Sequence, residues 1–294
     1  MFGDLSGFSS ARVVLNNFDA YQTGFVPSAA LSGGIKIAEY ESPRPVDRAF
    51  YHFNSFTYMN PDVNPNVNPT HIARHVLGLE KSLFQGSASV GVRLPFVNLY
   101  GNRQLADTQF ADMSVILKLA LINEPGGNVF TAGAMLTVPS GQGTTVDTSS
   151  SRIGPVAVGG AQVISATYFQ AYLAFIRYLR PRLFLHGFSS VLTPSDSRLV
   201  TLLANDFGLV YLWTRSFREG VIQGVMPTVE LHVNTPLNHR GATTQPIGFV
   251  DNVNLTAGCS FLLDRAVLGW AIGAPLTGPR PFALELIGTM NFRF

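Results

Sequence analysis

The sequence contains little charge: only 13% of its 294 residues are Asp, Glu, Lys or Arg, about half the share of an ordinary soluble domain. It also contains no uninterrupted apolar run of about 18 residues, the length that a membrane-spanning helix needs. The first shortage argues against an ordinary cytosolic enzyme, and the second against a helical membrane protein. Because 22 Phe are present, the chain is too aromatic to be disordered. The composition therefore favours a large β structure, and one that faces lipid is the leading candidate.

Further absences exclude several kinds of site. The single cysteine, Cys259, excludes an internal disulfide and a cysteine-built metal centre. His71 and His75 have a metal-ligand spacing, but Ile72 stands where the zinc-protease motif needs Glu, so we expect no metal and no cofactor. The net charge of +2 without a cluster of Lys and Arg makes nucleic acid an unexpected partner. Residues 1–5 lack a basic or apolar leader, so we expect a processed or truncated form of an exported protein.

What the sequence does contain is a period of two. In the C-terminal run, apolar residues such as Leu286 and Met290 alternate with polar residues such as Glu285 and Arg293. The same alternation recurs over residues 111–121. Because successive side chains of a strand point to opposite faces, each run places its polar groups on one side only.

Counting such runs predicts the number of strands. Twelve strands are expected, at roughly 48–59, 71–84, 88–99, 109–122, 128–138, 163–178, 182–192, 198–214, 221–235, 252–263, 267–276 and 282–294. Short turns alternate with mostly longer loops between them, as in up-and-down membrane barrels, which have an even number of strands. We therefore predict an all-β fold, a single up-and-down antiparallel transmembrane β-barrel of about 12 strands. A soluble β-sandwich or lipocalin-like barrel is the alternative, but these runs have the length of a membrane-spanning strand.

The N-terminal part of the chain differs from the rest. Residues 1–47 are Pro/Gly-rich and lack clean periodicity, and Pro43 and Pro45 deny a sheet its backbone donors. A domain boundary is therefore expected, with the barrel over residues 48–294. We predict that residues 1–47 either lie in the periplasm or plug the lumen.

The C-terminus resembles a known signal. Phe294 ends the sequence, and Phe292 and Met290 precede it at alternating positions. This pattern resembles the C-terminal assembly signal of bacterial outer-membrane barrels, although Gly288 departs from it, because a larger apolar residue is usual there. The resemblance implies two partners, the barrel-assembly machinery and the lipid of a Gram-negative outer membrane.

Other stretches resemble one family of barrels. Leu79–Phe84 with Ser89–Pro95, and Ala271–Pro281, resemble outer-membrane porins that include proteins of phenol-degradation meta-pathway operons. Lys36–Phe53 resembles barrels of this kind from planctomycete-type bacteria. The resemblance covers most of the chain in pattern but few residues in identity. It implies a channel or transporter in the bacterial outer membrane and supplies no catalytic residues.

The polar face of the strands provides the candidate functional residues. The expected pore-lining residues are Arg74, Glu80, Arg93, Asp112, Lys118, His186, Glu230, His232, Glu285 and Arg293. Since both signs of charge are nearly balanced, these side chains could line a wet pore or close it through ion pairs. We predict a channel for passive passage of small-molecule solutes, not an enzyme, and leave homo-oligomerisation open. The main alternative is a plugged structural or surface-interaction barrel.

A barrel-borne hydrolase is the third interpretation. Glu230 shares a strand face with His232, and a carboxylate can orient an imidazole for base chemistry. His186 with Ser190 invites comparison with the outer-membrane phospholipase, which is also a twelve-stranded barrel. In that enzyme the His and Ser face lipid, whereas His186 here belongs to the presumed inner face, and the family's His-x-Ser-Asn-Gly-like run is missing.

Overall fold

The structure is a computed structural model. It describes residues 1–3, 10–17, 20–27, 36–62, 69–101, 107–141, 144–147, 161–164, 166–197, 199–214, 221–240 and 251–294. No helix in this part of the chain is long and apolar enough to cross a membrane.

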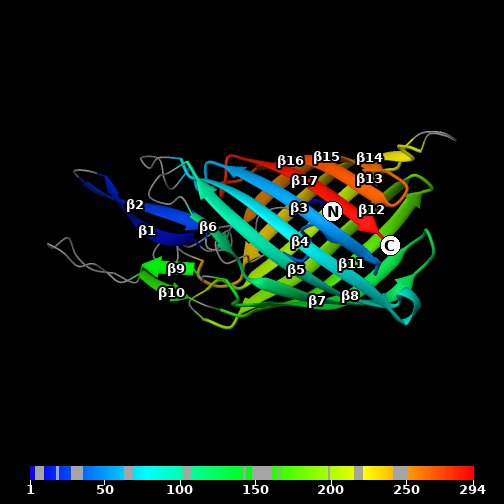
Figure 1. Ribbon diagram of the computed structural model, residues 1–294, viewed down its shortest axis with the longest axis horizontal. Coiled ribbons are helices and arrows are strands. Elements are labelled where there is room, and N and C mark those ends of the chain that lie inside the picture. The colour runs from blue at the N-terminus through cyan, green and yellow to red at the C-terminus, as the bar shows by residue number, and fades with distance from the viewer. Residues whose placement is uncertain are drawn as a thin grey trace.

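Twelve antiparallel strands form a closed ring (Figure 1). They are β3 (Arg48–Thr57), β4 (His71–Leu83), β5 (Ala88–Tyr100), β7 (Met113–Asn123), β8 (Val129–Val138), β11 (Tyr168–Arg180), β12 (Leu183–Pro194), β13 (Leu202–Tyr211), β14 (Gly224–Pro236), β15 (Asn252–Leu262), β16 (Ala266–Pro275) and β17 (Leu284–Arg293). Each strand pairs with the next barrel strand along the chain, and β17 pairs with β3 to close the ring. An extra strand, β6 (Asp107–Phe110), pairs with one end of β5. The prediction of an all-β up-and-down barrel of twelve strands is confirmed.

The barrel has two unlike ends. Short turns link the strands at one end, for example the two residues between β11 and β12. Longer connections lie at the other, and beyond them lie two small hairpins, β1 (Ser10–Asn17) with β2 (Ala20–Pro27) and β9 (Thr144–Asp147) with β10 (Ala161–Ile164) (Figure 1). We call these the short-turn end and the long-loop end.

Alternating burial along the strands separates an inner from an outer face. On β7, Leu117 is 56% exposed, whereas its neighbour Lys118 is 4% exposed. On β17, Leu286 and Met290 are exposed and Glu285 is buried. A period of two therefore puts the apolar residues outside and the polar ones inside, because the ring encloses one face of every strand.

Several predicted strand boundaries are wrong. The run over 163–178 begins in β10, with β11 starting at Tyr168, and β13 starts at Leu202 and not at 198. The run over 109–122 divides, because β6 ends at Phe110 and β7 begins at Met113. At the C-terminus, the sequence pattern places Phe282 on the outer face, but it is fully buried and its ring lies 5.4 Å from that of Phe56. The strand β17 itself starts at Leu284, directly after the hydrogen bond from the Ala283 N–H to the Thr57 carbonyl at 2.9 Å.

Candidate channel lumen

The first described residues of the chain and residues 36–47 occupy the inside of the ring. All side chains from Lys36 to Glu41 are buried. Pro43 accepts a hydrogen bond from the Thr131 hydroxyl at 2.8 Å. At the short-turn end, the Arg44 guanidinium donates to the carbonyl oxygens of Glu124 and Gly127, each at 2.9 Å, in the turn between β7 and β8. We call residues 36–47 the inner segment. It contacts the wall of the barrel from Lys36 to the mouth at the short-turn end.

The upper part of the inner segment contacts β13 and β14. The Lys36 ammonium donates to Asp206 Oδ1 at 2.7 Å and to Asn234 Oδ1 at 3.0 Å. Asp206 Oδ1 also lies 2.8 Å from His232 Nδ1, and all of these side chains are buried. A charge buried in this way is costly unless it is paired, so the ion pair ties Lys36 to its place.

Arg93 on β5 binds the main chain of the inner segment. Its guanidinium donates to the carbonyl oxygens of Lys36, Ile37 and Glu39 at 3.1, 3.2 and 2.8 Å. It also donates to Glu41 Oε2 at 2.9 Å. One arginine therefore satisfies acceptors along a single turn of the chain, which suits its planar set of donors.

Glu41 is the centre of a cluster of buried charges. Besides Arg93, it accepts from Lys118 Nζ at 2.6 Å and forms an ion pair with Arg48. Lys118 and Arg48 also reach Glu80, at 2.7 and 2.8 Å. Three cations of the wall thus surround one carboxylate of the inner segment and one of the wall.

A further pair links the inner segment to β4. Glu39 forms a buried ion pair with Arg74, and Arg74 also donates to Asn54 Oδ1 at 3.3 Å. Asn54 in turn donates to Glu285 on β17. Each charged side chain between Lys36 and Glu41 therefore has an oppositely charged partner on the wall.

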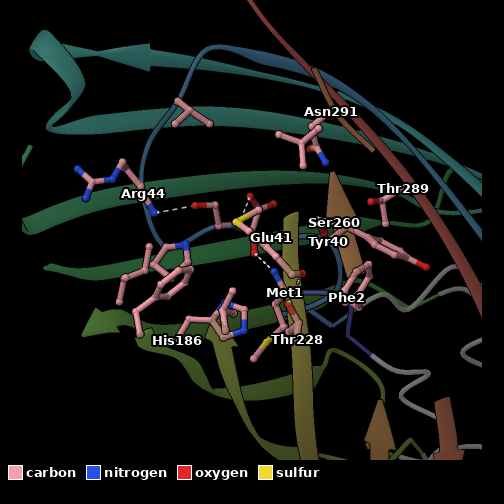
Figure 2. Close-up of a pocket in the computed structure, with 18 of the residues that line it drawn as sticks. Met1, Phe2, Tyr40, Glu41, Arg44, His186, Thr228, Ser260, Thr289 and Asn291 are labelled. Carbon is pink, nitrogen blue, oxygen red and sulfur yellow. Dashed lines mark hydrogen bonds between the residues drawn. The ribbon is translucent and has the colours of Figure 1, made fainter. Parts of the chain in front are cut away.

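Beside the inner segment lies a cavity of about 420 Å³ at the short-turn end. In Figure 2, Tyr40 and Glu41 of the inner segment lie over it, and Thr228 and His186 come from the wall. Much of its lining from β11 to β16 is apolar: Ile176, Phe184, Val210, Leu212, Met226, Leu262 and Val267. The inner segment therefore does not fill the whole width of the barrel.

Most of the expected pore-lining residues lie inside the ring. Fully or nearly buried on the inner face are Arg74, Glu80, Arg93, Lys118, His186, Glu230, His232 and Glu285. Asp112 is also buried, but it lies between β6 and β7, where it accepts a hydrogen bond from the Gly141 N–H at 2.9 Å. Burial raises the pKa of Asp112, against the opposing effect of that bond. Arg293 is exposed and lines the cavity at the short-turn end.

The residues considered for catalysis have other contacts. Glu230 accepts the backbone N–H groups of Phe2 at 2.9 Å and Gly3 at 3.1 Å, and lies 3.3 Å from His186. The Ser190 hydroxyl is bound by Gln170 at 2.8 Å. Glu230 thus binds the first residues of the chain, and Ser190 is a hydrogen-bond partner of Gln170.

The histidines considered for metal binding lie on the outer side of β4. His71 Nδ1 accepts the Tyr58 N–H at 3.2 Å, and His75 Nδ1 lies 2.7 Å from the Tyr51 hydroxyl. Within the described residues, no group of three or more His, Cys, Asp or Glu side chains could hold a metal ion.

The C-terminal residues lie at the short-turn end on the outer face. Phe294, Phe292 and Met290 are exposed by 63, 46 and 48%. The Lys81 ammonium lies 5.8 Å from the centre of the Phe294 ring.

Sequence reasoning assigned no role to single residues of the inner segment. Lys36, Glu39 and Glu41 form a short charged stretch directly before the first barrel strand, in a chain with little charge. That concentration of charge was the available signal. The partner of each could not be read from it, since Lys36 and Asp206 are 170 residues apart.

Comparison with known proteins identifies the fold. No family model matches the sequence, and no curated protein matches it. Among solved structures, the chain is similar to an outer membrane channel from Pseudomonas putida F1, with a TM-score of 0.59 and 12% identity over 88% of this chain and 100% of that one. It is also similar to the β domain of the Bordetella autotransporter BrkA (TM-score 0.50, 11% identity, 84% and 99% covered) and to the KdgM porin (0.48, 9%, 84% and 99%). These likenesses show that the fold is that of outer-membrane β-barrels.

Proposed function

We propose that this protein is an outer-membrane channel for small molecules, and that the inner segment is a plug that closes its lumen. The observation that carries the proposal is the matching of charges between the plug and the wall. Lys36 faces Asp206, Glu39 faces Arg74, and Glu41 faces Arg93 and Lys118. Such ion pairs hold the segment in one position. Because they are non-covalent, water can replace each partner when the segment moves.

The cavity beside the plug supports passage of solutes. It lies at the short-turn end, which in this fold faces the periplasm. Solutes that enter from the outside would reach it along the lumen once the plug shifts. The mechanism is diffusion, with the inner charges setting selectivity and the mixed lining of the cavity admitting small molecules that carry both polar and apolar parts.

Exchanging the charges of one pair tests the plug. Lys36→Asp and Asp206→Lys each place like charges within reach of each other, so each single variant should raise the ion conductance of the protein in a planar bilayer. The double variant restores an opposite pair and should return the conductance toward that of the original protein. Exchange of the exposed pair Arg240 and Asp251, which are 2.6 Å apart, is the matched control and should change nothing.

The alternative is a structural barrel that never conducts. If folded Lys36→Asp, Asp206→Lys and double variants all remain closed, the channel function is wrong and the structural role stands. The hydrolase interpretation has no geometric support among the described residues.

We also propose that the protein belongs to the porin family that includes proteins of phenol-degradation operons. The two adjacent resembling stretches lie in β4 and β5, and they supply Glu80 and Arg93, which form the cluster around Glu41. Membership would therefore predict the same contacts in other members. Native mass spectrometry measures whether the protein forms homo-oligomers. Liposome swelling measures which small molecules pass through it.

Recognition by the barrel-assembly machinery is proposed from the C-terminus. Phe294 and Phe292 present exposed rings on the outer face next to the closing strand β3. Phe294→Ala should lower the amount of folded protein in the outer membrane, whereas Leu286→Ala on the same face should leave it largely unchanged. Equal yields for both variants would contradict the signal.

A further inference from the structure

Arg177 is a charged residue on the outer face of the barrel, where the other strands place mainly apolar residues. Its neighbours Ile176 and Tyr178 line the cavity inside, so strand geometry points Arg177 outward. It is exposed. Lys81 on β4 also points outward, but it has a carboxylate partner, Asp47, at 2.6 Å.

Two more exposed arginines follow Arg177 within five residues. Arg180 ends β11, and Arg182 lies in the turn before β12. Within the described part of the chain, none of the three arginines forms an ion pair. The hairpin therefore carries three exposed arginines at the short-turn end, Arg177 on the outer face of β11 and Arg180 and Arg182 at the turn itself.

The other short turns lack this charge. The turn between β4 and β5 carries no charged residue over 84–87, and the turn between β7 and β8 holds Glu124 together with the Arg44 guanidinium. Asp264 and Arg265 neutralise each other between β15 and β16. The positive charge is thus confined to the hairpin of β11 and β12 among the turns that the structure describes in full.

Aromatic residues place this hairpin at a membrane surface. Tyr211 pairs with Leu183, next to Arg182, and is 46% exposed, while Trp213 is 59% exposed. Exposed Tyr and Trp mark the level of the lipid headgroups in membrane barrels. Arg177 lies two residues deeper than Leu183 and opposite Leu185, so its long side chain reaches the headgroup level by extending toward the turn.

We propose that Arg177, Arg180 and Arg182 form a binding site for the phosphate of an anionic phospholipid headgroup. A guanidinium matches a phosphate with two parallel hydrogen bonds, and an anionic membrane surface attracts each cation near it. The short turns face the periplasm in this fold, where the adjacent leaflet consists of phospholipid. The site rests on the outer-membrane placement proposed above and is independent of whether the lumen conducts.

Native mass spectrometry of the full chain in detergent tests the site. The protein is titrated with phosphatidylglycerol in competition with phosphatidylcholine. The variant Arg177→Gln/Arg180→Gln/Arg182→Gln should lose affinity for phosphatidylglycerol by about fivefold per arginine, on the order of 100-fold together. The matched control is Arg240→Gln/Arg265→Gln/Arg280→Gln, which removes three exposed arginines that have aspartate partners. It should change the affinity by less than about twofold, because exposed pairs contribute little.

Several results would overturn the proposal. They are an unchanged preference for phosphatidylglycerol in the triple variant, no preference in the original protein, and stronger binding of lipid A than of phosphatidylglycerol. If the triple variant fails to fold, Arg177→Gln is compared with Arg177→Lys, and only the former should lose binding. Planar-bilayer conductance is measured on the same samples. If the protein does not conduct but binds phosphatidylglycerol through the arginines, the channel function is contradicted and the lipid site is not.

Discussion

The two sides of the lumen differ at the short-turn end. On the side of β3 to β8, buried cations and carboxylates hold the inner segment, as the cluster of Arg48, Glu80 and Lys118 around Glu41 shows. On the side of β11 to β16, apolar residues such as Val210 and Val267 line the cavity. At this end the segment is thus fastened to one wall and leaves room beside the other, whereas farther inside the barrel Lys36 is held by β13 and β14.

The largest expected effect comes from the wall that holds the segment. Arg93→Ala removes the donor to three carbonyl oxygens and leaves Glu41 with one cation fewer. Breaking a buried charge pair in this way should lower the free energy of unfolding by about 3–5 kcal/mol and raise conductance. Urea unfolding in lipid vesicles measures the first quantity and planar bilayers the second. Arg44→Ala, at the exposed mouth, is the milder control; equal losses for both would remove the special role of Arg93.

The outer faces of the two walls should respond alike. Leu117→Lys lies on the side of the charged wall and Leu255→Lys on the side of the cavity, and both leucines are exposed. Each variant should lose about 2–4 kcal/mol of stability in lipid, because an ammonium near the middle of the bilayer is poorly solvated. Vesicle unfolding provides the comparison. Retained stability in either variant would show that the face concerned does not meet lipid.

Insertion of a large side chain should distinguish the inner faces. Val267→Trp can place its ring in the cavity, so we expect a change below about 1.5 kcal/mol. Ser89→Trp has no such space, because Ser89 is buried and donates to Glu80 at 2.7 Å, and overpacking there should cost about 1–3 kcal/mol. Both values come from the same unfolding assay. A larger loss at Val267 than at Ser89 would contradict the asymmetry.

The smallest effect concerns the point where the inner segment joins β3. Hydrogen bonds from Lys81 and Ser82 lower the pKa of Asp47 from 3.8 to about 2. Its contribution to stability is therefore present above pH 3.8 and is lost as the pH falls toward 2. The difference in urea midpoint between the original protein and Asp47→Asn should be small at pH 6 and vanish near pH 2. A difference that grows on acidification would show that the carboxylate does not stabilise the fold.

Local pattern was enough to predict the barrel but not what lies inside it. The alternation of Leu286, Met290 and their polar neighbours depends only on strand geometry, and it gave the strand number and the faces correctly. The partners of Lys36 and Glu41 depend on side chains brought together from distant strands, which no local period records. Phe282 was misplaced for a related reason, since its ring packs against Phe56 from the other end of the barrel sequence.

The path of the chain before β3 has a consequence for the order of assembly. The hairpin of β1 and β2 lies beyond the long-loop end, and the stretch from Lys36 to Asp47 runs inside the ring to the short-turn end (Figure 1). The seam between β3 and β17 joins the strand that follows this stretch to the last strand made. A hairpin cannot easily be threaded through a finished cylinder. We therefore expect the stretch to be laid down first and the sheet to wrap around it, with closure of the seam between β3 and β17 as the last step of folding.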